Sequence, residues 1–346
     1  MNFGFTEDQD MIRKSAKDFV TNESSLERIR AMHTDGTGYS EELWGKIAEN
    51  GWCAAVLPEE YGGIGLGYCD LICITEECGK GLMPEPLIQT SVLGGNAILY
   101  GGTAEQKTDL LPEVAAGSLK VALGAYEAAG RYNLAHVETS AAASNGGYTL
   151  NGTKFLVQNA ATADKIVVTA RTSGSAKDRS GITLFILDKD AKGLTVTPVT
   201  TIDHHPRSTV TLNNVQVGAD AVLGTVGEAY AAVERAIDGA TVALCAEMVG
   251  GMATSLAMTV QYSHERVQFG VPIGTFQALR HKAANMFMTL EMAKSAMYYA
   301  AMAADQDMPD RKAAISAAKA LCSDGYTFVA KEAIQMHGGI GFTEEH

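Results

Sequence analysis

The chain has 346 residues, of which 46% are hydrophobic and 19% charged, which excludes a disordered chain and predicts two or three domains. Asp and Glu outnumber Lys and Arg by 40 to 27, and the net charge of −13 argues against a nucleic-acid partner. The longest apolar stretch, from Met248 to Val260, is too short to span a membrane, and acidic residues near the N-terminus (Glu7, Asp8, Asp10) are unlike a signal peptide. We therefore expect a soluble, cytoplasmic protein without a membrane span.

The six cysteines are scattered along the chain and form no disulfide framework, so we expect reduced thiols. Cys69 and Cys73 are four residues apart and could share a helix face, which admits a metal site. The alternative is that both are small buried hydrophobes, and it is favoured because no histidine lies nearby. The pair His204-His205 is followed by Pro206 and is more typical of a strand end or turn. We assign no metal.

Residues 1–120 have helical periodicity interrupted by Gly- and Pro-marked turns. Thr6 and Gln9 have the spacing of a capping box at the start of an amphipathic helix. The segment 58–63 breaks the helical pattern, and residues 70–80 resume it. This part of the chain is predicted to be an N-terminal all-helical domain.

Residues 121–225 change to a period of two, which indicates strands. Asn151-Gly152 lies between two apolar runs (148–150 and 154–157), a pattern that predicts a β-hairpin turning at these two residues. Residues 209–217 alternate polar and apolar, as in a half-exposed strand. We expect a middle antiparallel, β-barrel-like domain.

Residues 226–346 return to helical spacing and form a predicted C-terminal helical bundle domain. Three long stretches are expected, and the third ends at Gly338-Gly339, a typical helix stop. Three long antiparallel helices are most of a four-helix bundle, so the bundle is predicted to be truncated. The fold class is therefore α+β multidomain. Two apolar stripes at steps of three and four support the first two helices: Val242, Cys245, Val249, Met252, Leu256, Val260; and Phe276, Leu279, Ala283, Met286, Leu290, Ala293, Met297.

One basic residue stands out as a candidate ligand-binding group. Arg266 opens the segment Arg-Val-Gln-Phe-Gly after a long predicted helix, and Phe276-Gln277 begins the next helix. An arginine beside a turn and a helix start is a plausible anion site, although a solvated helix end has the same appearance. The glycine-rich segment 62–67 lacks the preceding strand and the lysine of a phosphate-binding loop, and we interpret it as a loop that shapes a pocket.

The order of these features resembles the acyl-CoA dehydrogenase family over the whole chain. The resemblance rests on the three zones in sequence and on four motifs: Phe5-Thr6-Glu7-Asp8-Gln9, Leu57-Pro58-Glu59-Glu60-Tyr61-Gly62-Gly63, Arg266-x-x-Phe269-Gly270 with Phe276-Gln277, and Gln335-Met336-His337-Gly338-Gly339. Within the family, segments 217–224, 243–247 and 338–341 are most similar to small-subunit types, such as the pimeloyl-CoA dehydrogenase small subunit.

The resemblance implies a fold, a cofactor and a reaction. The cofactor is FAD, the substrate is an acyl-CoA thioester, and the C2 and C3 hydrogens are removed, with hydride transfer to the flavin. It also implies electron-transfer flavoprotein as the acceptor and a homo- or hetero-oligomer, a dimer or tetramer, whose nucleotide site crosses the subunit boundary. By motif, Arg266 would pair with the pyrophosphate, and Phe269 and Gln277 would line the same nucleotide. The segment from Gln335 to Gly339, which includes His337 and Gly338, would hold the diphosphate and adenosine end from the neighbouring subunit, and Gln158 is also implied in FAD binding.

The sequence departs from the family at the flavin. The usual Thr-Glu-Pro-Gly-x-Gly-Ser-Asp loop is Tyr126-Glu127-Ala128-Ala129-Gly130-Arg131-Tyr132-Asn133 here. The usual Trp-Ile-Thr-Asn segment is Leu156-Val157-Gln158-Asn159, so an aromatic ring is lost and Gln158 replaces the hydroxyl that reaches the flavin edge. The arginine of the family's Asp-x-x-Arg contact is Thr241.

The catalytic base is unknown from the sequence. In most of the family it lies beyond position 346, and in some members its place corresponds to Ala240 here. Glu247 lies seven residues on, on the same helix face, and is either a stand-in base or a polar replacement where relatives commonly have glutamine. We expect an FAD-dependent acyl-CoA dehydrogenase-like subunit. The alternative is a non-catalytic partner subunit of a heteromeric dehydrogenase, and a purely structural helical module would leave the collinear motifs unexplained.

Overall fold

The computed structural model describes residues 5–35, 38–343 and 346. The chain divides into two compact units. One, here called the helical unit, comprises Met1–Leu26, Tyr68–Met83 and Thr241–His346. The other, here called the sheet unit, comprises Glu27–Gly67 and Pro84–Ala240. Both the helical ends of the chain and the strands between them agree with the expected α+β class.

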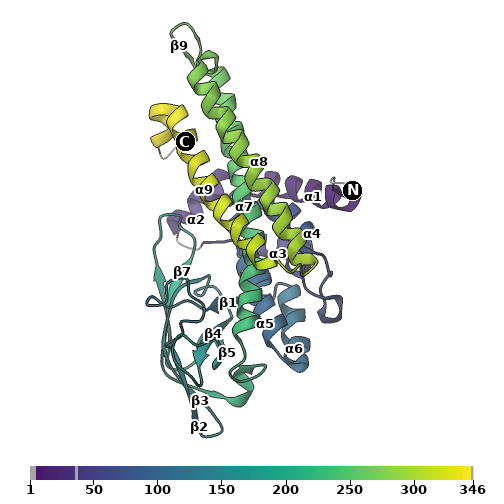
Figure 1. Cartoon of the computed structure of the whole chain (residues 1–346), viewed down its shortest axis with the longest axis vertical. Coiled ribbons are helices and arrows are strands. Elements are labelled where there is room, and N and C mark those ends of the chain that lie inside the picture. Colours follow the sequence, from purple (N-terminus) through teal and green to yellow (C-terminus); the bar gives the residue numbers. More distant parts are fainter. Residues whose placement is uncertain (1–4, 36–37, 344–345) are drawn as a thin grey trace. The chain divides into compact units, whose positions relative to one another are not determined.

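The helical unit is built from long helices whose apolar stripes form a common core. Its elements are α1 (Glu7–Glu23), α4 (Tyr68–Lys80), most of α7 (Tyr230–Glu265), α8 (Gln277–Asp305) and α9 (Arg311–His337). The predicted capping box is confirmed: Gln9 N–H donates to Thr6 Oγ1 (3.2 Å), and Thr6 N–H donates to Gln9 Oε1 (3.1 Å). Helices α8 and α9 lie side by side (Figure 1) and are joined by the Lys282–Glu332 ion pair.

Glycines allow α4 and α7 to touch backbone to backbone. A Cβ added at Gly79 of α4 would lie 2.0 Å from the carbonyl oxygen of Glu247, and one at Gly250 of α7 would lie 2.0 Å from that of Glu76. Both distances are far inside van der Waals contact, so no larger residue fits without separating the two helices.

Small residues on α8 serve the same core. Ala293, Ala300, Ala301 and Ala303 are at most 1% exposed and lie within the unit. Their periodicity therefore reflects close packing inside the chain, and it is not by itself evidence for an interface with a second subunit.

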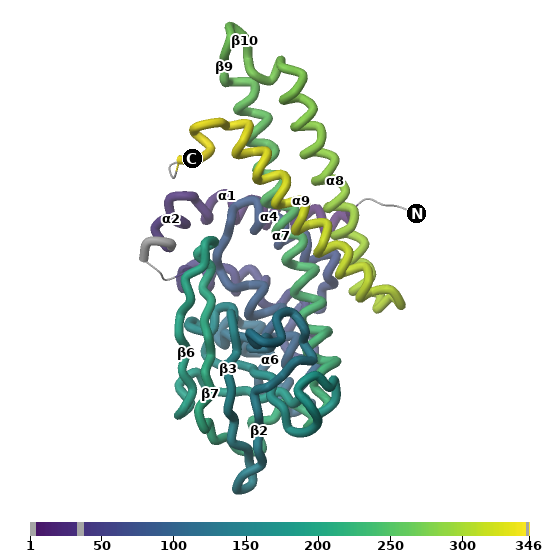
Figure 2. The backbone as a smooth tube through the Cα atoms, turned by 60° about the vertical axis from the view of Figure 1, so that its left-hand side comes forward, coloured from purple at the N-terminus to yellow at the C-terminus, as the bar shows by residue number. Residues whose placement is uncertain are grey.

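The sheet unit combines a mostly antiparallel sheet with short helices (Figure 2). The helical elements are α2 (Leu26–Asp35), α3 (Glu41–Glu49), a π-helical turn (Ile88–Gly94), α5 (Gly95–Gly101) and α6 (Ala104–Ala115). The strands pair in the order β6-β7-β3-β2-β4-β5-β8, and β1 joins β4 in parallel. Their bounds are β1 Val121–Gly124, β2 Ser140–Ser144, β3 Gly147–Gln158, β4 Lys165–Arg171, β5 Ile182–Asp188, β6 Leu194–Val199, β7 Arg207–Gly218 and β8 Val222–Leu223.

The predicted hairpin at Asn151-Gly152 is wrong. These residues lie within the single strand β3, and the chain turns instead at Asn145 and Gly146, which have φ values of 49° and 81°. Gly152 marks an irregularity in the pairing of β3 with β7, where a Cβ would lie 2.4 Å from Thr139 Oγ1. Glycine is needed there because of this close approach and not because of a turn.

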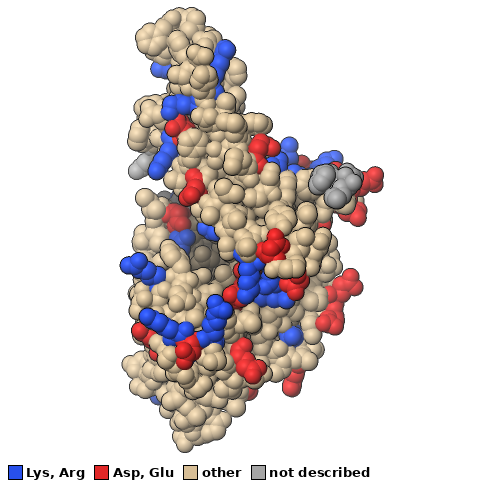
Figure 3. Space-filling view, in the orientation of Figure 1, with Lys and Arg blue, Asp and Glu red and all other residues tan. Residues whose placement is uncertain are grey.

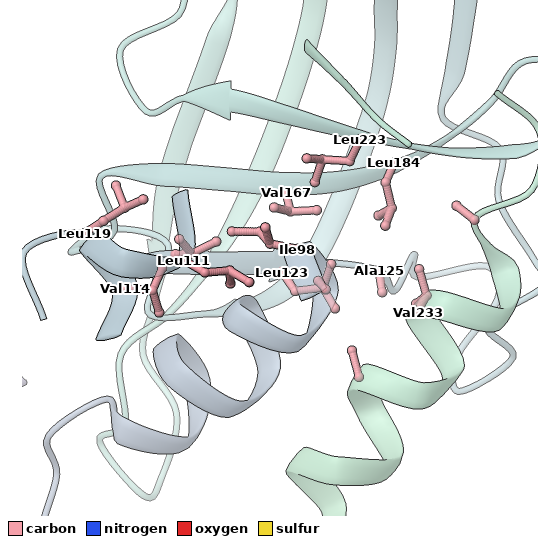
Figure 4. Close-up of a cluster of buried hydrophobic side chains, with 14 of the residues drawn as sticks. Ile98, Leu111, Val114, Leu119, Leu123, Ala125, Val167, Leu184, Leu223 and Val233 are labelled. Atoms are coloured by element: carbon pink, nitrogen blue, oxygen red, sulfur yellow. The ribbon is translucent and has the colours of Figure 1, made fainter. Parts of the chain in front are cut away.

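Both faces of the sheet are buried near its centre. Figure 4 shows Val167 of β4 and Leu184 of β5 directed toward Ile98, Leu111 and Val233, which come from α5, α6 and the start of α7. The alternating neighbours Ile166, Val168 and Phe185 belong to a second cluster. Because β4 is buried on both faces, it is a continuous apolar run rather than an alternating one.

By length and composition, α7 could cross a membrane. Half of its most apolar window is buried, and its residues Val242, Val249 and Met252 belong to the core of the helical unit. A core helix of a globular protein has the same composition, so this is weak evidence for a membrane span.

Candidate functional site

The turn after α7 exposes an arginine next to aromatic rings. Arg266 is the first residue after the helix and precedes a small hairpin of β9 (Val267–Gln268) and β10 (Val271–Pro272). Ile273 N–H donates to the Arg266 carbonyl (2.8 Å), which closes the turn. Phe269 at the tip is 92% exposed with φ 55°, and its ring lies edge-on to Phe276 at 6.1 Å. The guanidinium and a large aromatic face are thus both free to contact another molecule.

The start of α8 lies next to this turn. Gln277 is exposed and opens the helix, and Phe276 at the cap position supplies no side-chain hydrogen bond to the first N–H groups. The uncapped positive end of a helix favours anions. In the view of Figure 3, this end of the helical unit carries basic side chains with an acidic group between them, on mostly uncharged surface.

The end of α9 presents glycine backbone to solvent. Gln335, Gly338 and Gly339 are exposed, and no atom lies within 4 Å of a Cβ built at either glycine. Gly338 has φ 66°, which its helix-stop role requires, but packing within the described chain does not require glycine at 339. A backbone open on this side can approach a phosphate or a ring closely.

A ring stack joins these two segments within the helical unit. His337 is 7% exposed, and its ring stacks on Tyr262 of α7 with centroids 4.6 Å apart and planes at 27°. Its Nδ1 lies 2.8 Å from the Ala333 carbonyl oxygen, which assigns the proton to Nδ1. Because Tyr262 is one turn before Arg266, the stack brings the Arg266 turn and the Gly338-Gly339 turn to the same end of the unit. Arg266, Phe269 and Gln277 therefore lie toward the same end of the helical unit as Gln335, His337, Gly338 and Gly339.

Gln158 lies in the sheet unit, at the end of β3, and is half-buried. Two residues of the same segment, Leu156 and Asn159, have φ values of 51° and 53°. Positive φ is costly for a leucine, and such strain persists where surrounding contacts impose it. Beside Gln158, the buried atoms Asn159 Nδ2 and Ser208 Oγ have no hydrogen-bond partner among the described residues. Unsatisfied polar atoms at the paired ends of β3 and β7 are a fitting feature for a site completed by a ligand.

A buried ion pair fixes this region. Lys154 is fully buried, and its Nζ lies 2.6 Å from Glu127 Oε1 and 2.9 Å from Thr169 Oγ1. Burial lowers the pKa of Lys154 to about 8, with the Glu127 carboxylate opposing that shift. The pKa of Glu127 is lowered, since Lys154 and hydrogen bonds from Thr139 and the Glu138 N–H outweigh the opposing effect of burial. The sequence signal for this pair is a lysine at an inward position of the β3 pattern, which we had not assigned a role.

Glu247 lies inside the helical unit rather than on an open surface. Its carbonyl faces Gly79 of α4, and burial raises the pKa of its carboxyl to about 7. The pKa of Tyr326 on α9 is raised by burial and, to a smaller extent, by the Glu247 carboxylate. These neighbours favour a role within the helix packing, and we assign Glu247 no catalytic part. Among the residues that the structure describes, no group of three or more His, Cys, Asp or Glu could hold a metal ion.

Family models and known proteins match the chain over nearly its whole length. The family models described as acyl-CoA dehydrogenase N-terminal, middle and C-terminal domains match residues 6–118, 122–215 and 229–346. The probable acyl-CoA dehydrogenase YngJ of Bacillus subtilis is 32% identical over 100% of this chain and 92% of its own length. The structure of butyryl-CoA dehydrogenase from Megasphaera elsdenii superposes with a TM-score of 0.92 at 30% identity, covering 100% of this chain and 92% of that one. The FAD complex of PigA gives a TM-score of 0.92 at 27% identity, covering 100% and 91%.

The chain belongs to the acyl-CoA dehydrogenase family. It is an FAD-dependent oxidoreductase of acyl-CoA thioesters, which confirms the fold, the cofactor and the reaction class implied by the sequence.

Proposed function

We propose that the end of the helical unit holds the diphosphate and adenosine part of FAD. The observation that carries this proposal is the Tyr262–His337 stack, which places Arg266 and the open Gly338-Gly339 backbone together. Arg266 would pair with the pyrophosphate, Phe269 and Gln277 would line the nucleotide, and the exposed glycines would admit close backbone contact. Gln158 would meet the flavin edge from the sheet unit.

When bound, FAD supplies hydride acceptance at its isoalloxazine ring, the step that protein side chains cannot perform. Each unit of this chain would bind and orient one end of an FAD molecule, in a site shared with a second subunit. Deprotonation of C2 needs a carboxylate base, and we assign none among the described residues. We propose electron-transfer flavoprotein as the acceptor, a cytoplasmic location, and a homo- or hetero-oligomer in which the nucleotide site is shared between subunits.

The test is FAD affinity measured by titration of apoprotein. A charge-assisted contact to phosphate contributes ~1.5–3 kcal/mol, so Arg266→Ala should weaken FAD roughly tenfold or more. Arg311→Ala is the matched control, because Arg311 begins α9 at the opposite end of the helix and pairs with Asp307. Equal affinity of Arg266→Ala and wild type would contradict the assignment of Arg266.

A second candidate function is a non-catalytic partner subunit of a heteromeric dehydrogenase. It is favoured by the loss of the aromatic flavin contact at Leu156, which lies in a strained and partly exposed position. One solved relative is the Tcur3481-Tcur3483 steroid ACAD, in its G363A variant (TM-score 0.86, 32% identity, covering 98% of this chain and 89% of that one). Dye reduction by the lone chain across a panel of acyl-CoAs would reject the partner-subunit function, and activity only on co-expression with a homologous subunit would support it.

A further inference from the structure

We propose that Lys154 and Glu127 are a positioning pair that holds the flavin-binding edge of the sheet unit in its working conformation. This inference rests on the proposed function, which places Gln158 at the flavin. The pair is assigned no contact with substrate or cofactor. It acts through the two segments that it ties together, the loop of residues 127–139 and the end of β3.

Glu127 closes the 127–139 loop from its first residue to its last. Its Oε2 accepts the Glu138 N–H (2.7 Å), and its Oε1 accepts the Thr139 N–H (3.0 Å) and the Thr139 hydroxyl (2.7 Å). A single carboxylate thus fixes both ends of a loop that includes Arg131 and Tyr132. The loop tip itself is exposed, with Tyr132 at 91%.

Lys154 ties that closed loop to the sheet. Its Nζ reaches Glu127 Oε1 and Thr169 Oγ1 on β4, and the Thr169 hydroxyl in turn donates to the Ala125 carbonyl (3.4 Å). Gly124 makes room for the lysine stem, because a Cβ there would lie 3.1 Å from Lys154 Cγ. Two strands, β3 and β4, and the loop therefore meet at one ammonium group, while Gly124 of β1 packs against the lysine stem.

The next residues along β3 are those with unusual backbone. Phe155 N–H donates to the Tyr126 carbonyl (2.9 Å), directly beside the ion pair. Leu156 follows with positive φ, and the segment ends at Gln158 and Asn159. The strained backbone lies between the ion pair and the proposed flavin contact, so a shift of Lys154 or of the loop is transmitted to Gln158 first.

A buried ion pair is a poor device for stability alone. Desolvation offsets most of the attraction between such charges, and an apolar pair of similar volume is often as stable. The pair instead fixes the relative orientation of the groups around it, because each partner makes several hydrogen bonds in one geometry. A role in positioning predicts that the cofactor's environment, and not just the free energy of unfolding, depends on the pair.

The experiment compares Glu127→Gln and Lys154→Met with wild type, reading FAD affinity and the visible circular dichroism of bound flavin. We expect about tenfold weaker FAD and an altered flavin spectrum in each variant. If Lys154→Met does not fold, Thr169→Val is decisive, because it removes one lysine partner at nearly constant shape and should change the spectrum in the same direction.

The matched control is Leu184→Ala, a fully buried core substitution in the same unit away from the ion pair. It should lower the unfolding midpoint while the flavin spectrum and the FAD affinity stay as in wild type. Unchanged spectrum and affinity in Glu127→Gln and Thr169→Val would overturn the inference. Absence of FAD binding in wild type would instead defeat the proposed function itself, so the two failures are distinguishable.

Discussion

The Tyr262 ring stacks on the His337 imidazole at 4.6 Å, and this contact joins the last turn of α7 to the last turn of α9. The stacked rings lie one turn from Arg266 and immediately before Gly338. The nucleotide-binding end that we propose therefore depends on Tyr262, which need not touch the nucleotide, as well as on His337.

Replacing Tyr262 tests that dependence. An aromatic stack contributes about 0.5–1.5 kcal/mol beyond its buried area, so Tyr262→Ala should weaken FAD binding by roughly three- to tenfold. Tyr299→Ala is the control, since Tyr299 is an exposed tyrosine near the far end of α8, bonded to Asp310. Isothermal titration of apoprotein measures both. Equal weakening in the two variants would argue against a specific role of the stack.

The partly buried carboxyl of Glu247 makes stability depend on pH. Its ordinary pKa is 4.5, and burial raises it to about 7 in the folded chain. Between these values the folded state holds a proton that the unfolded state releases, so the contribution of Glu247 to the free energy of unfolding falls as pH rises from 4.5 to 7. Glu247→Gln should be more stable than wild type by about 1–2 kcal/mol at pH 8 and equal to it near pH 4.5. Urea unfolding at both pH values measures this, and a Gln variant less stable at pH 8 would contradict it.

Lys154 makes the free energy of unfolding depend on pH in the opposite direction, at alkaline pH. Its ordinary pKa is 10.5, and burial lowers it to about 8 when folded. Between those values the unfolded state binds the extra proton, so this residue's contribution to the free energy of unfolding rises with pH, by at most about 3 kcal/mol. In Lys154→Met this rise should vanish. Urea unfolding of both proteins at pH 7.5 and 10 isolates the effect, because other titrating groups cancel in the difference. Parallel pH profiles would show that Lys154 titrates normally.

Because α4 and α7 touch backbone to backbone, the effect on stability of replacing a glycine by alanine should depend strongly on the position of that glycine. Gly79→Ala would place a methyl group 2.0 Å from a carbonyl oxygen and should destabilise by about 2–4 kcal/mol. Gly45→Ala is the control, because no atom lies within 4 Å of that Cβ and Gly45 is in the middle of α3. It should stabilise by about 0.5–1 kcal/mol. Thermal unfolding gives both values, and a neutral Gly79→Ala would refute backbone contact between the helices.

Local patterns were sufficient for most of the elements. The capping box at Thr6, the helix stop at Gly338 and the apolar stripes of α7 and α8 depend on residues within a few positions of one another. The hairpin prediction at Asn151-Gly152 failed because a glycine can be required by a turn or by a close neighbour from elsewhere in the chain. At Gly152 that neighbour is Thr139, which no local pattern reveals.

The sequence by itself determined the class of protein, through the order of the three zones and the motifs around Arg266 and Gly338. Both motifs indicate their chemistry through residue type: Arg266 supplies a guanidinium group, and Gly338 leaves the backbone without a side chain. They can therefore be recognised from the sequence alone. The tertiary structure decided which distant residues act together: Tyr262 with His337, Lys154 with Glu127, and Gly79 with Glu247. It also showed that the alanines Ala293, Ala300, Ala301 and Ala303 of α8 are buried in the core of their own chain. The physical reason is that burial, ring stacking and the desolvation of a charge are set by which groups surround a residue in space, and packing brings those groups from far along the chain.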